Sequence, residues 1–179
     1  QLLPNPDQVH RVSIIPTSKG ALGYTMEMPE EDRYLMSEAA LGERLAVLLA
    51  GRAAELHVFD EISTGAANDL ERATELARRM VTEFGMSELL GPVRYTAPAG
   101  AGYLGPETML RTTSPATDAL IDQEIRRLIE EALDRARQLL RHNEDALHEI
   151  ARRLQEDEVL RGEEVARIAK DFAPAADRP

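Results

Sequence analysis

Apolar positions change their spacing at about residue 36, and this change predicts two kinds of structure. In "VHRVSII" and "ALGYTMEM" apolar and polar residues alternate, which is typical of short β-strands, and the "TSKG" between them predicts a turn. From Ser37 onward the apolar residues recur at helical spacing, as in the leucine-rich stripe between Leu41 and Leu56. The pattern therefore predicts a strand-rich opening followed by helices.

Five helices are predicted from periodicity and capping residues. Ser37 is the expected N-cap of the first helix, and Ser114-Pro115 is the expected start of the third, because proline is favoured at the first helical position. The remaining helices are expected over residues 64–84, 144–155 and 162–171. The fold class is thus mainly α, a helical bundle with a short N-terminal β-hairpin-like edge.

Composition and charge narrow the classes of function. The chain of 179 residues is long enough for one domain with a sizeable core. Its net charge of −11 argues against nucleic acid as a partner, and the lack of cysteine excludes disulfides and thiolate zinc sites. No apolar run approaches the roughly 20 residues that span a bilayer. Because the chain begins at Gln1 and not at methionine, we expect it to be a piece of a longer protein.

Asp69 lies on the apolar side of the second predicted helix. At about 100° per residue, Ala73, Leu76 and Met80 fall within about 40° of Asp69 on the helical wheel. An unpaired carboxylate buried there would cost several kcal/mol. The position therefore predicts a partner for Asp69.

Two kinds of partner are consistent with this position. Geometry alone favours an arginine such as Arg52, or the backbone N–H groups at the helix start, where the helix dipole favours negative charge. A metal ion is the other reading, and it needs further ligands. His57 is the histidine best placed to approach Asp69. "HEIAR" at residues 148–152 does not complete an HExxH zinc motif, because Arg152 stands at the second histidine position.

Several segments resemble the peptidase domain of FtsH-type proteins, which are membrane-anchored AAA+ zinc metalloproteases. They are "VHRVSIIP", "GALGYT", "PEEDRYLMS", "RLAVLLAGRAAE", "STGAANDLERATELARRMVTEFGMSELLGPVRY" and "YLG". They follow the family's order and spacing from Gln1 to about Ala169. The resemblance implies a peptidase-domain portion over residues 1–172 with a flexible tail over 173–179. Within it we expect a strand-rich substrate edge (1–35), zinc-side helices (36–85), a loop (86–113) and a helical layer (114–172).

The resemblance also implies a zinc site that this chain contributes to but does not complete. In the family, two histidines of an HExxH helix and the aspartate of the "TGAxxD" segment bind Zn²⁺, and that aspartate corresponds to Asp69 here. The glutamate of HExxH is the general base. That helix would precede the segment matching "LLPN", so no catalytic residue is expected in this chain. The fragment should be inactive alone.

Further properties of the parent protein follow from the same resemblance. Protein substrates would add as a strand near the edge formed by Gly20, Ala21, Leu22, Gly23 and Tyr24. ATP and Mg²⁺ would bind an upstream AAA+ module, and the parent would assemble as a homo-hexamer. The membrane would be contacted only through a missing N-terminal part, which makes this chain a cytoplasmic-facing soluble domain of an inner-membrane protein.

Two departures and one alternative accompany this reading. The family usually has Ala-Glu-Glu where this chain has Ala54-Glu55-Leu56, and "IIPTSKGALG" replaces a shorter loop at the substrate edge. The alternative is a non-catalytic helical oligomerisation or binding module from a paralogue that lost HExxH. The presence of Asp69 argues against that alternative, because a buried carboxylate has little reason to stay without a metal.

Overall fold

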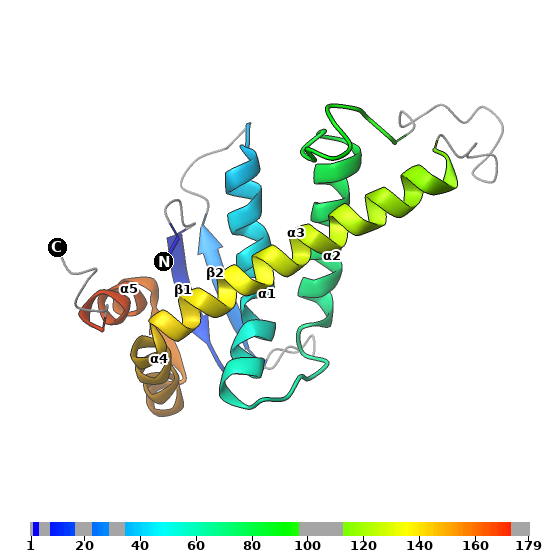
Figure 1. Cartoon of the computed structure of the whole chain (residues 1–179). Coiled ribbons are helices and arrows are strands. Elements are labelled where there is room, and N and C mark those ends of the chain that lie inside the picture. Colours follow the sequence, from blue (N-terminus) through cyan, green and yellow to red (C-terminus); the bar gives the residue numbers. More distant parts are fainter. Residues whose placement is uncertain (1, 4–7, 17–22, 29–34, 97–112, 173–179) are drawn as a thin grey trace. The chain divides into compact units, whose positions relative to one another are not determined.

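The structure is a computed structural model, and it describes residues 2–3, 8–16, 23–28, 35–96 and 113–172. Five helices and three strands lie in this part of the chain (Figure 1). In chain order they are β1 (Gln8–Ser13), β2 (Tyr24–Met28), α1 (Glu38–Val58), α2 (Ala67–Thr82), α3 (Pro115–His142), α4 (Glu144–Asp157), β3 (Val159–Arg161) and α5 (Gly162–Asp171). The mainly helical class expected from the sequence is confirmed.

The chain forms two compact units. The first comprises residues 1–35 and 137–179, and the second comprises residues 36–136. Of the segments expected from the sequence, residues 97–112 of the loop and the tail 173–179 lie outside the described residues. The division of the peptidase portion into an edge, zinc-side helices, a loop and a helical layer stays a prediction.

The first unit is built around a small antiparallel sheet in the order β2-β1-β3. β1 pairs with β2 from Gln8 opposite Met28 to Ser13 opposite Tyr24, with an irregularity between Val9 and Arg11. Along its other edge, β1 pairs Val12 with Leu160 of β3. The central strand therefore joins segments from near both ends of the sequence.

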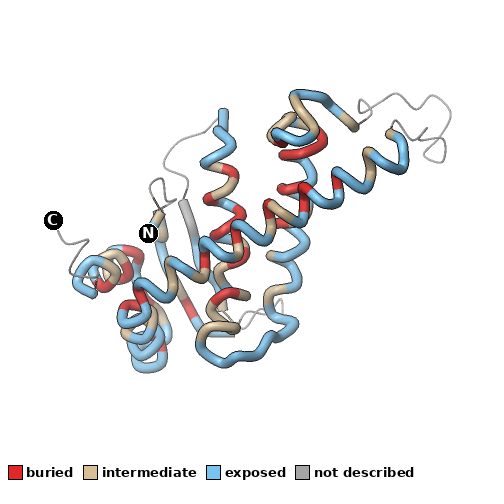
Figure 2. Tube along the Cα trace, in the orientation of Figure 1, coloured by how far each residue is buried: buried red, intermediate tan, exposed pale blue. Residues whose placement is uncertain are grey.

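Helices α4 and α5 belong to this unit and share a small apolar core with the sheet. Its buried members are Leu154, Leu160 and Val165, and Val12 and Ile150 pack against them. Glu164 Oε2 accepts a hydrogen bond of 3.0 Å from the backbone N–H of Arg161, which fixes the start of α5 directly after β3. Figure 2 shows buried residues on both helices.

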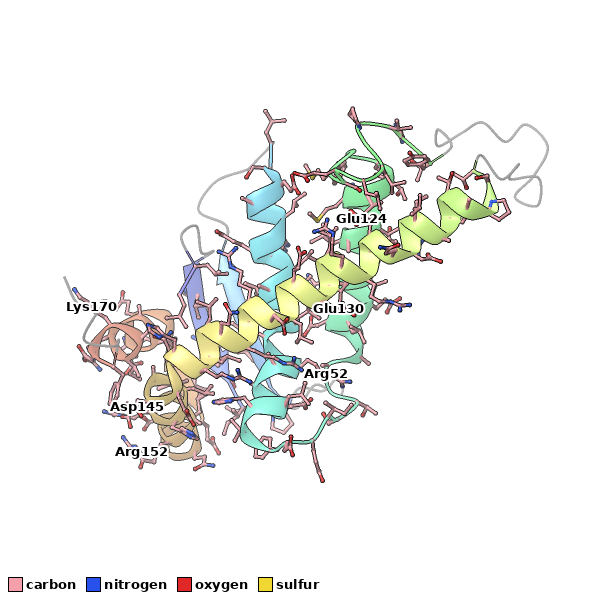
Figure 3. The ribbon with its side chains drawn as sticks, viewed as in Figure 1. Arg52, Glu124, Glu130, Asp145, Arg152 and Lys170 are labelled. Carbon is pink, nitrogen blue, oxygen red and sulfur yellow. The ribbon has the colours of Figure 1, made fainter. Side chains whose placement is uncertain are left out.

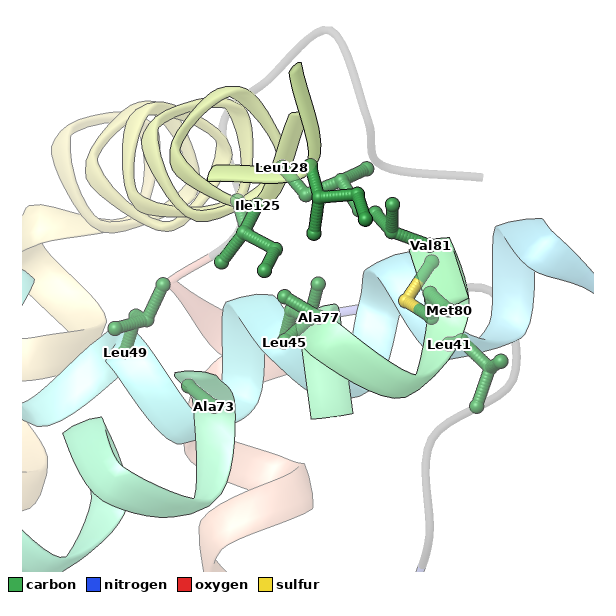
Figure 4. Packing of buried hydrophobic residues seen from close by; sticks show 11 residues of the cluster. Leu41, Leu45, Leu49, Ala73, Ala77, Met80, Val81, Ile125 and Leu128 are labelled. Carbon is green, nitrogen blue, oxygen red and sulfur yellow. The ribbon is translucent and has the colours of Figure 1, made fainter. Parts of the chain in front are cut away.

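The second unit is held together by apolar faces of α1, α2 and α3 that meet in one core (Figure 4). Ser37 caps α1, because its Oγ accepts a hydrogen bond of 3.2 Å from the N–H of Ala40. Gly85 has a φ of +65° just after α2, and the N–H of Met86 donates to the carbonyl of Met80 at 2.9 Å. The buried members of the core are Leu41, Leu45, Leu49, Ala73, Ala77, Met80, Val81, Ile121, Ile125, Leu128 and Ala132.

A buried carboxylate ties the loop after α2 to α3. Glu124 is 4% exposed, and its Oε2 accepts a hydrogen bond of 2.7 Å from Ser87 Oγ. Arg127 donates to both oxygens of Glu124, at 3.0 and 3.1 Å. Hydrogen bonds from Arg127 and Ser87 hold the pKa of Glu124 below its ordinary value. This buried charge is therefore fully partnered (Figure 3 labels Glu124).

We expect Glu124→Gln to lower the free energy of unfolding by about 2 kcal/mol at pH 7, because hydrogen bonds to a charged group are lost in a buried site. The folded-state pKa is lowered, so this stabilisation is present above the ordinary value of 4.5 and is lost as pH falls through the folded-state pKa. Urea unfolding at pH 7 and at pH 3 measures both effects. Glu130→Gln, at an exposed position on the same helix, is the matched control.

Gly162 gives a second test of the fold. A Cβ at this position would overlap the backbone carbonyl of Val9, whereas a Cβ at Gly51 on α1 would meet nothing within 4 Å. We expect Gly162→Ala to cost about 3 kcal/mol or more, because β1 must move. Gly51→Ala should stabilise the protein by about 0.5–1 kcal/mol. Chemical denaturation of the two variants checks this contrast, and equal effects would contradict the close approach of α5 to β1.

Candidate metal-ligand site at the start of helix α2

Asp69 is the third residue of α2 and lies on the same face as the buried Ala73 and Ala77. The buried face ends before it reaches Asp69, because the side chain of Asp69 is 48% exposed. The carboxylate is therefore at the helix end of an apolar face and not inside the core. The expectation of a buried carboxylate is corrected: the helical wheel gives the face of a residue but not how far packing extends along it.

The ion-pair partner of Asp69 is Arg72, one turn along the helix. Arg72 Nη1 lies 3.5 Å from Asp69 Oδ1, and the side chain of Arg72 is 55% exposed. Such an exposed pair within one helix contributes only a few tenths of a kcal/mol. Arg52, the partner considered from the sequence, instead donates from Nη1 to the carbonyl oxygen of Ser63 at 3.3 Å. Asp69 also lies in the first helical turn, where the helix dipole favours its charge.

Helix α2 begins three residues later than its sequence pattern predicts, and its N-cap has no capping side chain. The N-cap is Ala66, which cannot accept a hydrogen bond from the first turn through its side chain. The N–H of Ala67 donates to the carbonyl of Thr64 at 3.1 Å, and the N–H of Leu70 donates to that of Ala66 at 2.9 Å. The segment before the helix must therefore be fixed in another way.

Glu55, near the end of α1, holds this segment. Its Oε2 accepts a hydrogen bond of 3.2 Å from the backbone N–H of Ser63, and its Oε1 accepts one from Ser63 Oγ. Ser63 Oγ in turn accepts from the N–H of Gly65 at 3.0 Å. We call the contacts among Arg52, Glu55, Ser63 and Gly65 the Glu55–Ser63 clamp. Hydrogen bonds from Ser63, followed by the charge of Arg52, hold the pKa of Glu55 below its ordinary value.

An apolar pocket of about 160 Å³ lies beside the clamp, between α1 and the start of α2. Arg52 and Ser63 belong to both the clamp and the pocket wall, and Figure 3 labels Arg52 near the end of α1. The remaining lining residues are Leu48, Leu49, Thr64, Ala66, Ala67 and Leu70. Leu70 is the residue after Asp69 and is 43% exposed. The surface next to the candidate ligand is thus mostly apolar.

The described residues do not contain a complete zinc site. Among them no group of three or more histidine, cysteine, aspartate or glutamate side chains is placed to hold a metal ion. Asp69 fits the role of a single ligand, because its carboxylate is half exposed and, within the part of the chain that the structure describes, is held by one weak ion pair. His57 lies in the last turn of α1 and is partly buried. Its approach to Asp69 stays a prediction.

The charged residues of the "HEIAR" segment on α4 form an ion-pair network, whereas Ile150 packs against the core. Arg152 bonds Glu149 at 2.7 Å and Glu156 at 2.6 Å, and Arg153 adds a contact of 3.1 Å to Glu149. These arginines lower the pKa of Glu149 to about 2. Arg152 is labelled on α4 in Figure 3. His148 is 58% exposed, whereas Glu149 is only 18% exposed because the two arginines cover it, and both side chains take part in ion pairs within the helix.

The expected substrate edge is only partly covered by the structure. Residues 20–22 (Gly20, Ala21 and Leu22) lie outside the described residues, whereas Gly23 directly precedes β2 and Tyr24 begins it. A Cβ at Gly23 would lie 2.5 Å from the carbonyl oxygen of Ser13, so only glycine allows this approach to β1. Tyr24 is 37% exposed. In the described sheet, β2 pairs only with β1 and forms an edge.

Comparison with known proteins assigns the chain to a peptidase family. The model of peptidase family M41 matches residues 1–168. The chain therefore belongs to peptidase family M41.

Curated relatives carry the name ATP-dependent zinc metalloprotease FtsH. The protein of that name from Pseudothermotoga lettingae is 49% identical over 94% of this chain and 27% of its own length. FtsH 1 of a Thermoanaerobacter species is 48% identical, over 94% of this chain and 28% of its own. FtsH 4 of a Synechocystis species is 46% identical, over 92% of this chain and 26% of its own length. The chain thus spans about a quarter of the length of these relatives.

Within the part of the chain that the structure describes, no helix combines the length and the apolar character needed to cross a bilayer.

Proposed function

We propose that this chain is the peptidase-domain portion of a membrane-anchored, ATP-dependent zinc metalloendopeptidase that degrades misfolded or membrane proteins. The family match over residues 1–168, together with the carboxylate of Asp69 in the first turn of α2, carries this proposal. In it, Asp69 is one of three protein ligands to zinc. The other two are histidines of an HExxH helix in the preceding part of the parent protein.

Zinc in a site of this kind supplies Lewis-acid chemistry to a peptide bond. The residues of this chain would orient one ligand and shape the surface beside it. Asp69 is accessible on one side, where it is 48% exposed, and is backed on the other by the buried α2 face. Ligands that approach from another segment could therefore reach it without unfolding the helix. Because the two histidines and the general base of the HExxH helix would lie in the preceding part of the parent protein, the fragment alone is proposed to be inactive.

The edge strand β2 is proposed to bind the substrate. An extended peptide that adds to a sheet edge gains backbone hydrogen bonds regardless of its sequence, which suits an enzyme acting on many proteins. β2 lies at an edge of the described sheet, and Tyr24 and Met26 on it are 37% and 47% exposed. The close fit of Gly23 against β1 keeps that strand in place.

The remaining elements of the proposal concern the parent protein. ATP and Mg²⁺ would bind an AAA+ module outside this chain, six copies would form a ring, and the membrane anchor would precede the module. This chain would then face the cytoplasm at an inner membrane. The names of the relatives support the ATP-dependent zinc protease class, and the chain's share of their length leaves room for such a module.

One observation favours a second candidate, a non-catalytic helical oligomerisation or binding module. Asp69 is half exposed and is already paired with Arg72, so its presence needs no metal to offset a buried charge. The objection from the sequence was that a buried carboxylate would not persist without a metal. It no longer applies, because Asp69 is half exposed. The two candidates differ in whether the parent protein binds zinc.

We expect Asp69→Asn in the full-length parent protein to lower zinc affinity about 10- to 100-fold or more and to abolish casein degradation. Helix content and thermal unfolding should change little, because the side chain is half exposed and its ion pair is weak. Zinc stoichiometry, casein turnover and circular dichroism measure the three effects. The matched control is Asp122→Asn on α3, at an exposed position. Unchanged zinc binding and turnover would mean that Asp69 is only a structural carboxylate, whereas a wild-type protein that neither binds zinc nor degrades casein would favour the non-catalytic candidate.

A further inference from the structure

Helix α2 lacks a side-chain cap, and this makes its starting point depend on contacts outside the helix. The side chain of Ala66 offers no acceptor to the first turn, so a capping side chain does not decide where the helix begins. Asp69 is the third residue of the helix and so lies in its first turn, and unwinding of that turn from the N-terminal end would release Asp69 from its helical position. The orientation of Asp69 therefore depends on what fixes the segment before Ala66.

The Glu55–Ser63 clamp is the described contact that fixes this segment. Ser63 is held through all three of its polar groups: Glu55 accepts from its N–H and its hydroxyl, and Arg52 donates to its carbonyl oxygen. Hydrogen bonds of this charge-assisted type are the strong ones in proteins. Because Ser63 Oγ also accepts from the N–H of Gly65, the clamp reaches to within one residue of the N-cap.

Both charged members of the clamp come from a well-anchored part of α1. Arg52 and Glu55 are three residues apart and so lie on neighbouring positions of one helix face. Between them, Ala53 is fully buried, and Leu49 one turn earlier is 2% exposed. Because core packing fixes α1, the hydrogen bonds that join Arg52 and Glu55 to Ser63 also fix the segment before α2. A cap internal to α2 would not couple the two helices in this way.

We propose that Glu55 is a positioning residue for Asp69: through Ser63 it sets the start of α2 and so aims the Asp69 carboxylate at the metal position. The inference rests on the proposed function, in which Asp69 is a zinc ligand. Glu55 itself does not contact the metal in this account, because both of its carboxylate oxygens accept hydrogen bonds from Ser63. Groups that orient metal ligands affect metal affinity about 10- to 100-fold.

A first experiment tests the clamp without any metal. Amide hydrogen exchange of the 179-residue chain is compared for wild type, Glu55→Gln and Ser63→Ala. We expect exchange at Gly65 to rise at least about tenfold in both variants, since the hydrogen bond to Ser63 Oγ is lost or loosened. Glu75→Gln, at an exposed position on α2, is the matched control and should leave the exchange rate at Gly65 unchanged. Exchange at Gly65 that equals wild type in both clamp variants would overturn the inference.

A second experiment measures zinc affinity of the full-length parent protein with a competing chelator. Glu55→Gln and Ser63→Ala should each weaken zinc binding about 10- to 100-fold, and the double variant no more than the stronger single one. Ser63→Thr keeps the hydroxyl and should retain most of the wild-type affinity. Thermal unfolding identifies any variant that has simply failed to fold.

The outcomes separate the inference from the proposed function. If Ser63→Ala binds zinc like wild type while Glu55→Gln does not, Glu55 acts on the metal directly and the positioning role is wrong. If neither variant changes zinc affinity while Asp69→Asn does, only the inference fails. If Asp69→Asn also leaves zinc affinity unchanged, the proposed function fails, whatever the exchange at Gly65 shows.

Discussion

The packing of α1 against α2 determines the geometry of the described part of the second unit. Ala73 and Ala77 on α2 are completely buried, and their small side chains let the backbone of α2 approach the leucines of α1. Leu45 and Leu49 fill the space between the helices. The two carboxylates of the candidate metal-ligand site lie on this helix pair, with Asp69 on one member and Glu55 on the other. Core packing thus sets how α1 and α2 lie against each other, and the Glu55–Ser63 clamp holds the segment that leads into the first turn of α2, where Asp69 lies.

Three carboxylates of the second unit show how environment separates structural from chemical roles. Glu124 is almost fully buried, and its oxygens are occupied by Ser87 and Arg127. Glu55 is partly buried and has both oxygens occupied by Ser63. Asp69 is half exposed, with one long contact to Arg72. Of the three, Asp69 is therefore the one with lone pairs accessible to an incoming group, and the other two hold segments in place.

Much of the fold follows from local sequence signals. Ser37 and Pro115 mark helix starts that the structure confirms, and the alternating pattern before residue 30 corresponds to β1 and β2. β3 was not predicted, because three residues are too few to show a period of two. The late start of α2 was also missed: Ser63 and Thr64 resemble capping residues, but the side chain of Ser63 bonds to Glu55 and Gly65 instead.

The candidate site was predicted less completely than the fold. Asp69 was found from its face on the helical wheel and from a family resemblance, but its exposure depends on where the core ends, which a wheel does not contain. The clamp links residues eight positions apart across a turn, from Glu55 to Ser63. Neither helical nor strand periodicity relates such positions. The only sequence signal for the clamp was that the two segments containing its residues, "RLAVLLAGRAAE" and the one that begins "STGAAND", resemble FtsH-type proteins.

The central place of β1 in its sheet has a consequence for the order in which the protein is made. Its partners are β2, close to it in sequence, and β3, which comes near the end of the chain. Synthesis proceeds from the N-terminus, so β1 and β2 leave the ribosome long before β3 and α5 exist. A two-stranded hairpin is marginally stable by itself. The edge strand proposed to receive substrates therefore becomes firmly supported only after β3 and α5 have been made, by which time the helices around Asp69 have also been translated.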